Sequence, residues 1–106
     1  MKVYIGGPIK GYSNRNISAF AEAERKLLAL GHEPINPHNI PVDHEGKPCI
    51  GDQATNGHGY GCYMIPDLKA LLDCQGYTLL NGWENSRGAK VEKEVAMICG
   101  LEYVEI

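Results

Sequence analysis

The residues best suited to chemistry by type and spacing gather in the stretch 82–100, GWENSRGAKVEKEVAMICG. Its pattern is that of a strand exit, a polar turn and an amphipathic helix, with Ser86 and Gly88 at the helix start and Glu92 about one turn inside. In open α/β folds, ligands bind at the carboxyl ends of strands, where a helix N-terminus presents N–H groups. We therefore expect the active centre in this stretch.

Glu92 and Asp67 are the candidate chemical groups, and each allows a plainer role. A carboxylate such as Glu92 can attack an electrophilic carbon, for example the anomeric carbon of a sugar. It can also simply stabilise a helix start through the helix dipole, which is the role that the neighbouring charges Lys93 and Glu94 favour. Asp67, in a helical pattern over 63–72, is by itself most simply a solvated carboxylate.

Strands and helices alternate along the chain. Strands are expected at Lys2–Gly6, 32–36, 77–80 and 101–106, and helices at 14–30, 63–72 and from Ser86 or Gly88 to Cys99. For the first helix we expect a cap at Ser13 or Asn14 and an end at Gly31. Its apolar residues are Ile17, Phe20, Ala21, Leu27, Leu28 and Leu30. The buried face expected for the last helix is Val91, Val95, Ile98 and Cys99.

This alternation predicts an α/β fold: one domain over 1–106 with a small doubly wound sheet, Rossmann-like or flavodoxin-like, of about four to five parallel strands. The loop after the first strand, GGPIKGYSN, lets backbone approach a ligand, but it matches neither a P-loop nor G-x-G-x-x-G. It is equally consistent with a plain strand-to-helix turn. Trp83 can stack on a base or serve only in packing.

The irregular segment over about 36–60 has the length of a functional loop or a disordered segment. It and its flank contain possible metal ligands, namely His38, His44, Cys49, His58 and Cys62. Their spacing is irregular and shows no paired-ligand knuckle, so solvated histidines are favoured over zinc. We expect neither a metal nor a cofactor.

Composition excludes several classes of partner. The net charge is −3 and no basic run exceeds two residues, so a nucleic acid polymer is not an expected ligand. No stretch approaches the roughly 20 apolar residues of a membrane span, and the start of the sequence lacks a signal-peptide core. We therefore expect no membrane association, a cytoplasmic location and cysteines present as reduced thiols.

Three blocks, VYIGGPIKG, IPDLKALLDC and GWENSRGAKVEKEVAMICG, resemble in order and spacing the nucleoside 2-deoxyribosyltransferase-like superfamily. The resemblance includes its branch of 2′-deoxynucleoside 5′-monophosphate N-glycosidases and short, often phage-encoded members without assigned function. It covers the chain except the segment 36–60. It implies a small-molecule nucleoside or nucleotide substrate, cleavage or exchange of the N-glycosidic bond, and a homodimer or higher homo-oligomer that closes the pocket.

Carried over by residue, the resemblance implies that Glu92 is the nucleophile and that Asp67 contacts the sugar hydroxyls and helps to protonate the leaving base. It places Tyr4 close to both nucleophile and sugar. The implied substrate-binding residues are Gly7, Ile9, Lys10, Gly11, Ser86 and Gly88, with Trp83 at the mouth of the site.

The chain departs from the family pattern at three positions. Pro8 stands where the monophosphate-specific branch has serine, Lys10 where it has arginine, and Gln75 where members commonly have aspartate. Phosphate binding is therefore a weaker inference from the resemblance. The base specificity does not carry over, because the segment 36–60 has no counterpart in the hydrolases of the family. Two other hypotheses remain: a nucleotide-binding module without turnover, and a structural protein in which the turn at Ser86 is only a helix cap.

Overall fold

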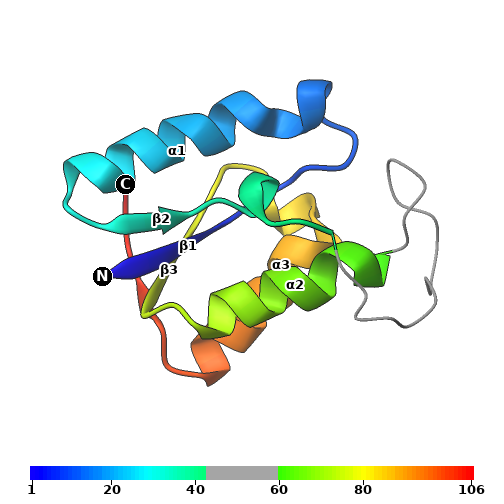
Figure 1. Ribbon diagram of the computed structural model, residues 1–106. Coiled ribbons are helices and arrows are strands. Elements are labelled where there is room, and N and C mark those ends of the chain that lie inside the picture. Colours follow the sequence, from blue (N-terminus) through cyan, green and yellow to red (C-terminus); the bar gives the residue numbers. More distant parts are fainter. Residues whose placement is uncertain (43–59) are drawn as a thin grey trace.

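The computed structural model describes residues 1–42 and 60–106, which form a parallel sheet flanked by helices (Figure 1). The strands are β1 (Lys2–Gly6), β2 (Glu33–Ile35), β3 (Gly76–Leu79) and β4 (Glu102–Tyr103). Their order across the sheet is β2-β1-β3-β4, and every pair is parallel. The expected α/β fold with a small parallel sheet is confirmed, with four strands in the described ranges.

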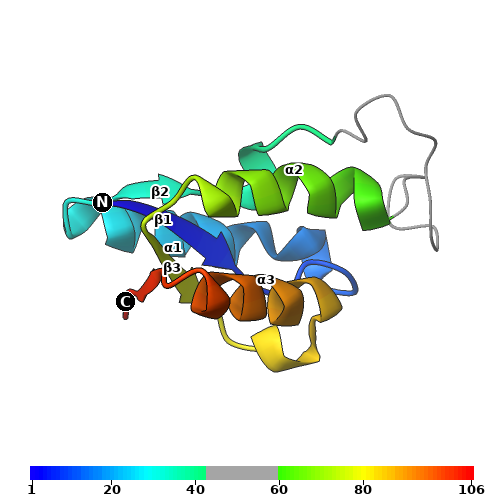
Figure 2. The same cartoon turned by 90° about the horizontal axis from the view of Figure 1, so that it is seen from below.

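Helices cover both faces of this sheet. The α-helices are α1 (Ile17–Ala29), α2 (Tyr60–Leu72) and α3 (Arg87–Ile98), and short 3-10 helices are η1 (Ser13–Asn16), η2 (Pro37–Asn39) and η4 (Trp83–Asn85). Figures 1 and 2 show α1 on one face and α2 with α3 on the other. None of the helices in the described ranges is long and apolar enough to span a membrane.

Alternation along β1 divides its side chains between two cores. Val3 and Ile5 belong to the core on the α1 side, whereas Tyr4 belongs to the core on the α2 and α3 side. The other buried members of the first core are Phe20, Ala23, Leu27 and Val104. Those of the second are Leu71, Cys74, Tyr77 and Ala96. Tyr4 therefore faces the helix that carries Glu92.

The start expected for the first helix is wrong. The apolar spacing predicts a helix over 14–30 capped by Ser13 or Asn14, whereas α1 begins only at Ile17. The preceding residue, Asn16, makes no side-chain capping hydrogen bond. The expected end is confirmed, since Gly31 has a φ of 84° directly after the last turn.

A left-handed turn explains the late start. Asn14, Arg15 and Asn16 have φ angles of 50°, 53° and 61°. Such residues cannot belong to a right-handed helix, and each left-handed residue other than glycine costs roughly 1–2 kcal/mol. Asn16 Nδ2 donates to the Pro8 carbonyl at 2.9 Å, which ties this turn to the loop after β1. The turn brings Arg15 out of the helix and towards the site.

The buried faces expected for two helices are partly wrong. α3 buries Ala89, Glu92 and Ala96, while the larger residues Val91 and Ile98 are 42% and 81% exposed. Cys99 is also exposed, and Val95 packs against the core at partial burial. In α1, Phe20 and Leu27 are buried as expected, but the exposed residues are Ile17, Ala21, Leu28 and Leu30. The small side chains of Ala89 and Ala96 let α3 approach the sheet closely. A prediction that places the largest apolar side chains inward therefore selects the wrong face of this helix.

Other element boundaries differ from expectation by a few residues, as is usual at frayed ends. The second helix begins at Tyr60 instead of 63, and the expected strands over 32–36, 77–80 and 101–106 become β2, β3 and β4. The first part of the irregular segment forms η2, and 43–59 lies outside the described residues.

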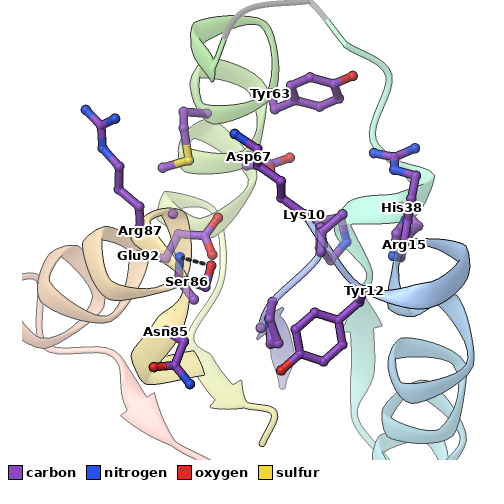
Figure 3. Close-up of a pocket in the computed structure, with 17 residues that line it drawn as sticks. Lys10, Tyr12, Arg15, His38, Tyr63, Asp67, Asn85, Ser86, Arg87 and Glu92 are labelled. Atoms are coloured by element: carbon purple, nitrogen blue, oxygen red, sulfur yellow. Dashed lines mark hydrogen bonds between the residues drawn. The ribbon is translucent and has the colours of Figure 1, made fainter. Parts of the chain in front are cut away.

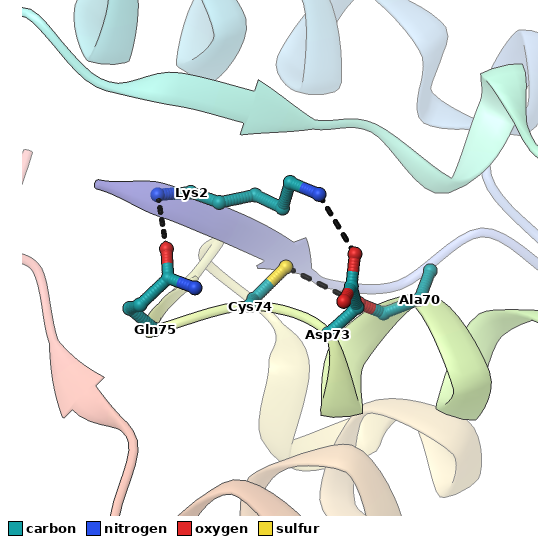
Figure 4. Close-up of polar contacts among 5 residues, drawn as sticks. All are labelled: Lys2, Ala70, Asp73, Cys74 and Gln75. Carbon is teal, nitrogen blue, oxygen red and sulfur yellow. Dashed lines mark hydrogen bonds and ion pairs between the residues drawn. The ribbon is translucent and has the colours of Figure 1, made fainter.

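Gln75 has a structural role at the amino edge of the sheet, which Figure 4 shows. Its Oε1 accepts a hydrogen bond from the Lys2 backbone N–H at 2.9 Å. Lys2 Nζ also donates to Asp73 Oδ2 at 2.7 Å, and Cys74 Sγ donates to the Ala70 carbonyl at 3.2 Å. Gln75 thus joins β1 to the start of β3, at the end of the strands opposite to the carboxyl edge. Its departure from the family pattern concerns sheet pairing.

Candidate active site

A cavity of about 260 Å³ opens where β1 ends. This is the point at which the strand order reverses, the usual ligand position in open α/β sheets. Figure 3 shows walls from the loop after β1, from η1 and η2, from α2 and from the start of α3. The described lining residues are Gly7, Pro8, Ile9, Lys10, Tyr12, Arg15, Pro37, His38, Tyr63, Met64, Asp67, Asn85, Ser86, Arg87, Gly88, Ala89 and Glu92.

Glu92 lies in the second turn of α3 and is 7% exposed. The Tyr4 hydroxyl, also buried, donates to Glu92 Oε2 at 2.7 Å. The helix-cap role for Glu92 is wrong, because Ser86 is the N-cap and its Oγ accepts a hydrogen bond from the Ala89 N–H at 3.1 Å. A carboxylate buried against a tyrosine hydroxyl at the wall of a cavity is instead placed to meet a ligand.

Asp67 faces the same cavity from α2 and is half-buried, so it is not the fully solvated carboxylate that its position alone suggests. Burial raises its pKa to about 7. Burial also raises the pKa of Glu92 to about 8; the Tyr4 hydrogen bond lowers that pKa, and the charge of Asp67 raises it. By these values Asp67 releases its proton before Glu92 in the free protein, which is the reverse of the order that a Glu92 nucleophile and an Asp67 acid require.

The Tyr4→Phe variant is expected to raise the pKa of Glu92 further, because the ionised carboxylate loses its hydrogen-bond donor. A carbon-13 NMR titration of the glutamate carboxyl signals measures this, with Glu92→Gln used to assign the signal. Tyr77→Phe is the matched control, since the Tyr77 ring packs against Tyr103. A Glu92 pKa that falls or stays constant in Tyr4→Phe would contradict the assigned hydrogen bond.

The N-terminus of α3 forms the wall beside Glu92. Ser86 and Gly88 line the cavity as expected, together with Asn85 and Arg87. The Arg87 and Gly88 amides precede the first hydrogen bond of the helix ladder, which runs from the Lys90 N–H to the Ser86 carbonyl at 3.0 Å. Amides at this position favour an anion, since they form the positive end of the helix dipole.

The loop after β1 supplies three of the four residues expected from it. Gly7, Ile9 and Lys10 line the cavity, whereas Gly11 is not among the described lining residues. A Cβ atom on Gly7 would lie 2.8 Å from Leu80 Cβ, so glycine is required there to let this loop pack closely against the end of β3. Gly11 has a φ of 83° and serves the turn itself.

Trp83 is also absent from the described lining. Lys93 Nζ lies 5.2 Å from the centroid of its ring, so the indole packs against α3. The packing role that the sequence left open fits this position better than stacking on a base.

The sequence does not predict that Arg15 and His38, on the opposite wall of the cavity, belong to the site. The helix predicted over 14–30 includes Arg15, and the sequence indicates His38 only as a possible metal ligand. The available signal was the pair of asparagines around Arg15, because asparagine tolerates the left-handed conformation better than most residues.

No group of three or more possible metal ligands occurs among the described residues. Of the candidates considered for zinc, His38 packs edge-on against Phe20 with ring centroids 4.8 Å apart, and Cys62 is buried in α2. His44, Cys49 and His58 lie outside the described residues.

Comparisons with known proteins agree with the fold. Among solved structures, the chain is similar to a 2-deoxyribosyltransferase from the psychrotolerant bacterium Bacillus psychrosaccharolyticus, with a TM-score of 0.64 and 16% identity. The similarity covers 97% of this chain and 69% of that one, and at such identity it shows a shared fold. The search of curated proteins finds no match. A family model described as "Domain of unknown function (DUF4406)" matches residues 1–105.

Proposed function

The chain belongs to the family described as Domain of unknown function (DUF4406), and we propose its activity from its site. We propose that it cleaves or exchanges the N-glycosidic bond of a (deoxy)nucleoside or nucleoside 5′-monophosphate. The observation that carries this proposal is the buried Tyr4–Glu92 hydrogen bond of 2.7 Å at the wall of a cavity shared with Asp67. The fold shared with a 2-deoxyribosyltransferase supports the same reaction class.

In the first step of the proposed reaction, the ionised Glu92 carboxylate attacks the anomeric carbon. The bond to the base breaks, and its electron pair leaves with the base. The carboxylate stabilises the oxocarbenium-like transition state by its charge and then forms a glycosyl ester. Tyr4 orients the carboxylate through its hydrogen bond. Asp67 gives a proton to the departing base. This requires that the positive charge developing on the sugar draws the negative charge to Glu92 and leaves the shared proton on Asp67, the reverse of their order in the free protein.

In the second step, a water molecule or another base attacks the same carbon, Asp67 takes the proton that the attacking group loses, and Glu92 is released as a carboxylate. Water makes the protein a hydrolase, and a second base makes it a transferase. The reaction balances without a metal or a redox cofactor. In this scheme Gly7, Ile9 and Lys10 surround the sugar, and the α3 N-terminus at Ser86 and Gly88 holds its 5′ end or a 5′-phosphate.

A second candidate is a nucleotide-binding module that sequesters its ligand without turnover. The observation that favours it is the raised pKa of both carboxyl groups, which disfavours the ionised nucleophile at neutral pH. Pro8, which lacks a hydroxyl group and an N–H, also lines the cavity where the monophosphate-specific branch has serine.

Incubation with a panel of deoxynucleosides and their 5′-monophosphates separates the two candidates. If the protein is a catalyst, at least one member of the panel releases free base, which chromatography detects. Addition of a second base distinguishes the two reactions, because exchange forms a new nucleoside or nucleotide and hydrolysis does not. Absence of free base together with tight retention of an unmodified nucleotide would reject catalysis in favour of the binding module. Absence of both would reject the site assignment.

We also propose that the protein forms a homodimer or higher homo-oligomer. We assign the contact to Met97 and Ile98, which are 53% and 81% exposed at the C-terminal end of α3. This end of the helix does not line the cavity, so closure of the pocket by a neighbouring subunit is a separate prediction. Exposed apolar side chains grouped on one helix are typical of association surfaces. Ile98→Lys is expected to shift the protein towards monomer in light scattering. Leu28→Lys, on α1 at the opposite face of the sheet and 60% exposed, is the matched control. A strictly monomeric wild-type protein that is active would contradict this proposal.

A further inference from the structure

Three consecutive residues before α1, Asn14, Arg15 and Asn16, have left-handed backbone angles, with φ of 50°, 53° and 61°. None of them is glycine, so each raises the free energy of the folded state. Residues in such conformations persist where the surrounding structure fixes them, and they cluster at functional sites. This turn adjoins the cavity, since Arg15 is part of the cavity wall (Figure 3).

Asn16 directly precedes α1 and occupies its N-cap position. Asparagine is among the best N-cap residues, because its side-chain oxygen accepts from N–H groups of the first helical turn. Asn16 makes no such hydrogen bond, and its φ of 61° lies outside the extended region that capping residues normally adopt. Its Nδ2 instead donates to the Pro8 carbonyl at 2.9 Å. A helix cap is thus replaced by a contact with the loop after β1.

Pro8 accepts this contact in the middle of the loop that lines the cavity. Proline has no N–H, so the carbonyl is its only backbone hydrogen-bonding group. Residues 7–10 of the loop all line the cavity. Beyond them, the Tyr12 N–H donates to the Ile9 carbonyl at 3.3 Å and closes the loop into a turn. The Asn16 amide therefore joins this loop to the left-handed turn before α1.

Building on the proposed function, we propose that Asn16 is a positioning residue, whose amide holds the loop after β1 in the shape that receives the sugar. Asn16 is not among the described residues that line the cavity, so it acts through Pro8 and not by touching the substrate. The left-handed turn is the conformation that brings its amide to the Pro8 carbonyl. The strain before α1 is accordingly the structural cost of a fixed substrate loop.

Asn16→Asp separates this role from a purely structural one. Aspartate has the same shape, can accept as an N-cap and suits the helix dipole, but its carboxylate cannot donate to the Pro8 carbonyl. Thermal stability is expected to stay near that of the wild type, because the cap and the dipole offset the lost hydrogen bond. KM for the substrate identified with the panel should rise about tenfold, the equivalent of one hydrogen bond, with a smaller change in kcat.

Two glycine variants separate the amide from the turn. Asn16→Gly adopts a left-handed φ without strain and removes the amide, so it should show the same rise in KM. Asn14→Gly is the matched control, since it relieves the strain at an exposed neighbour and retains the Asn16 amide. It should be more stable than the wild type, with an unchanged KM.

Amide hydrogen exchange in the ligand-free protein gives a second measurement that needs no substrate. The Tyr12 N–H should exchange faster in Asn16→Asp and Asn16→Gly, and at the wild-type rate or more slowly in Asn14→Gly. Unchanged Tyr12 exchange in both Asn16 variants would show that Asn16 does not hold the loop and would overturn the inference. A parallel loss of stability and kcat with an unchanged KM would also overturn it, because Asn16 would then be a structural residue only.

Failure of this inference is distinguishable from failure of the proposed function. Base release by the wild type, with a wild-type KM in both Asn16 variants, overturns the inference alone. If the wild type retains a nucleotide without releasing base, catalysis fails, and the affinities for that nucleotide replace KM in the same comparison. A wild type that neither cleaves nor binds any panel member overturns both.

Discussion

Glu92→Gln is expected to release base at least about 10³-fold more slowly than the wild-type protein while it keeps the fold. Glutamine preserves the size of the side chain and can still accept the Tyr4 hydrogen bond, but its amide neither attacks the anomeric carbon nor carries a negative charge. Initial rates on the substrate that the panel identifies measure the loss. Circular dichroism verifies that the variant is folded.

Glu94→Gln is the matched control, since Glu94 is two residues further along α3 and exposed. It should leave the rate unchanged. If Glu92→Gln released base as fast as the wild-type protein, Glu92 would not be the nucleophile, and Asp67 would remain as the carboxyl group of the cavity to be tested. If both variants lost activity equally, the effect would come from the charge of α3 and not from the buried position.

The stability of the wild-type protein is expected to fall as the pH rises from about 4.5 to about 8. The pKa of Glu92 is 4.5 in an unperturbed chain and about 8 in the fold, where burial dominates. Between these values the unfolded chain has released the proton and the folded chain still holds it, so deprotonation favours unfolding. Asp67, raised from 3.8 to about 7, acts in the same direction.

Urea unfolding over this pH range measures the effect, and a total on the order of a few kcal/mol is expected for the wild-type protein. Glu92→Gln removes one of the two titrating groups, so it should be more stable than the wild type at pH 8 and nearly equal to it at pH 4. Glu94→Gln should follow the wild-type curve. A wild-type stability that rises or stays flat between pH 5 and 8 would show that burial does not hold the proton on Glu92.

The two predictions describe one arrangement. Burial of Glu92 between α3 and β1 disfavours its ionised form in the free protein. The positive charge that develops on a sugar during bond cleavage would favour the ionised form again. The same burial is expected to reduce stability and to assist the reaction. Active sites commonly combine these two effects.

The order of elements was predictable because it depends on local signals. β-Branched runs, helical spacing and glycine stops identified the four strands and three α-helices that lie within residues 1–42 and 60–106. Short alternating elements of these two kinds lead to a parallel sheet. The resemblance of three sequence blocks placed Glu92, Asp67 and Ser86 at one cavity, where the structure also has them. The resemblance implied that Tyr4 lies beside Glu92, and the structure shows their hydrogen bond.

Other features depend on packing between distant segments and had no local signal. The left-handed turn at Asn14, Arg15 and Asn16 is held by a hydrogen bond to Pro8, and the helical spacing of the residues that follow it hid the turn. The outward position of Val91 and Ile98 follows from which side of α3 fits the sheet, a choice that apolar pattern predicted wrongly.

For the stretch 82–100, the sequence by itself determined a turn, a capped helix and an acidic residue on it. The structure confirms Ser86 at the start of this helix, as its cap. Only the tertiary structure decided that Glu92 is buried against Tyr4. The physical reason is that capping involves neighbours in sequence, whereas burial of a carboxylate depends on which face of the helix meets β1. The same dependence on packing brought Arg15 and His38 to the cavity, where composition and spacing had placed neither.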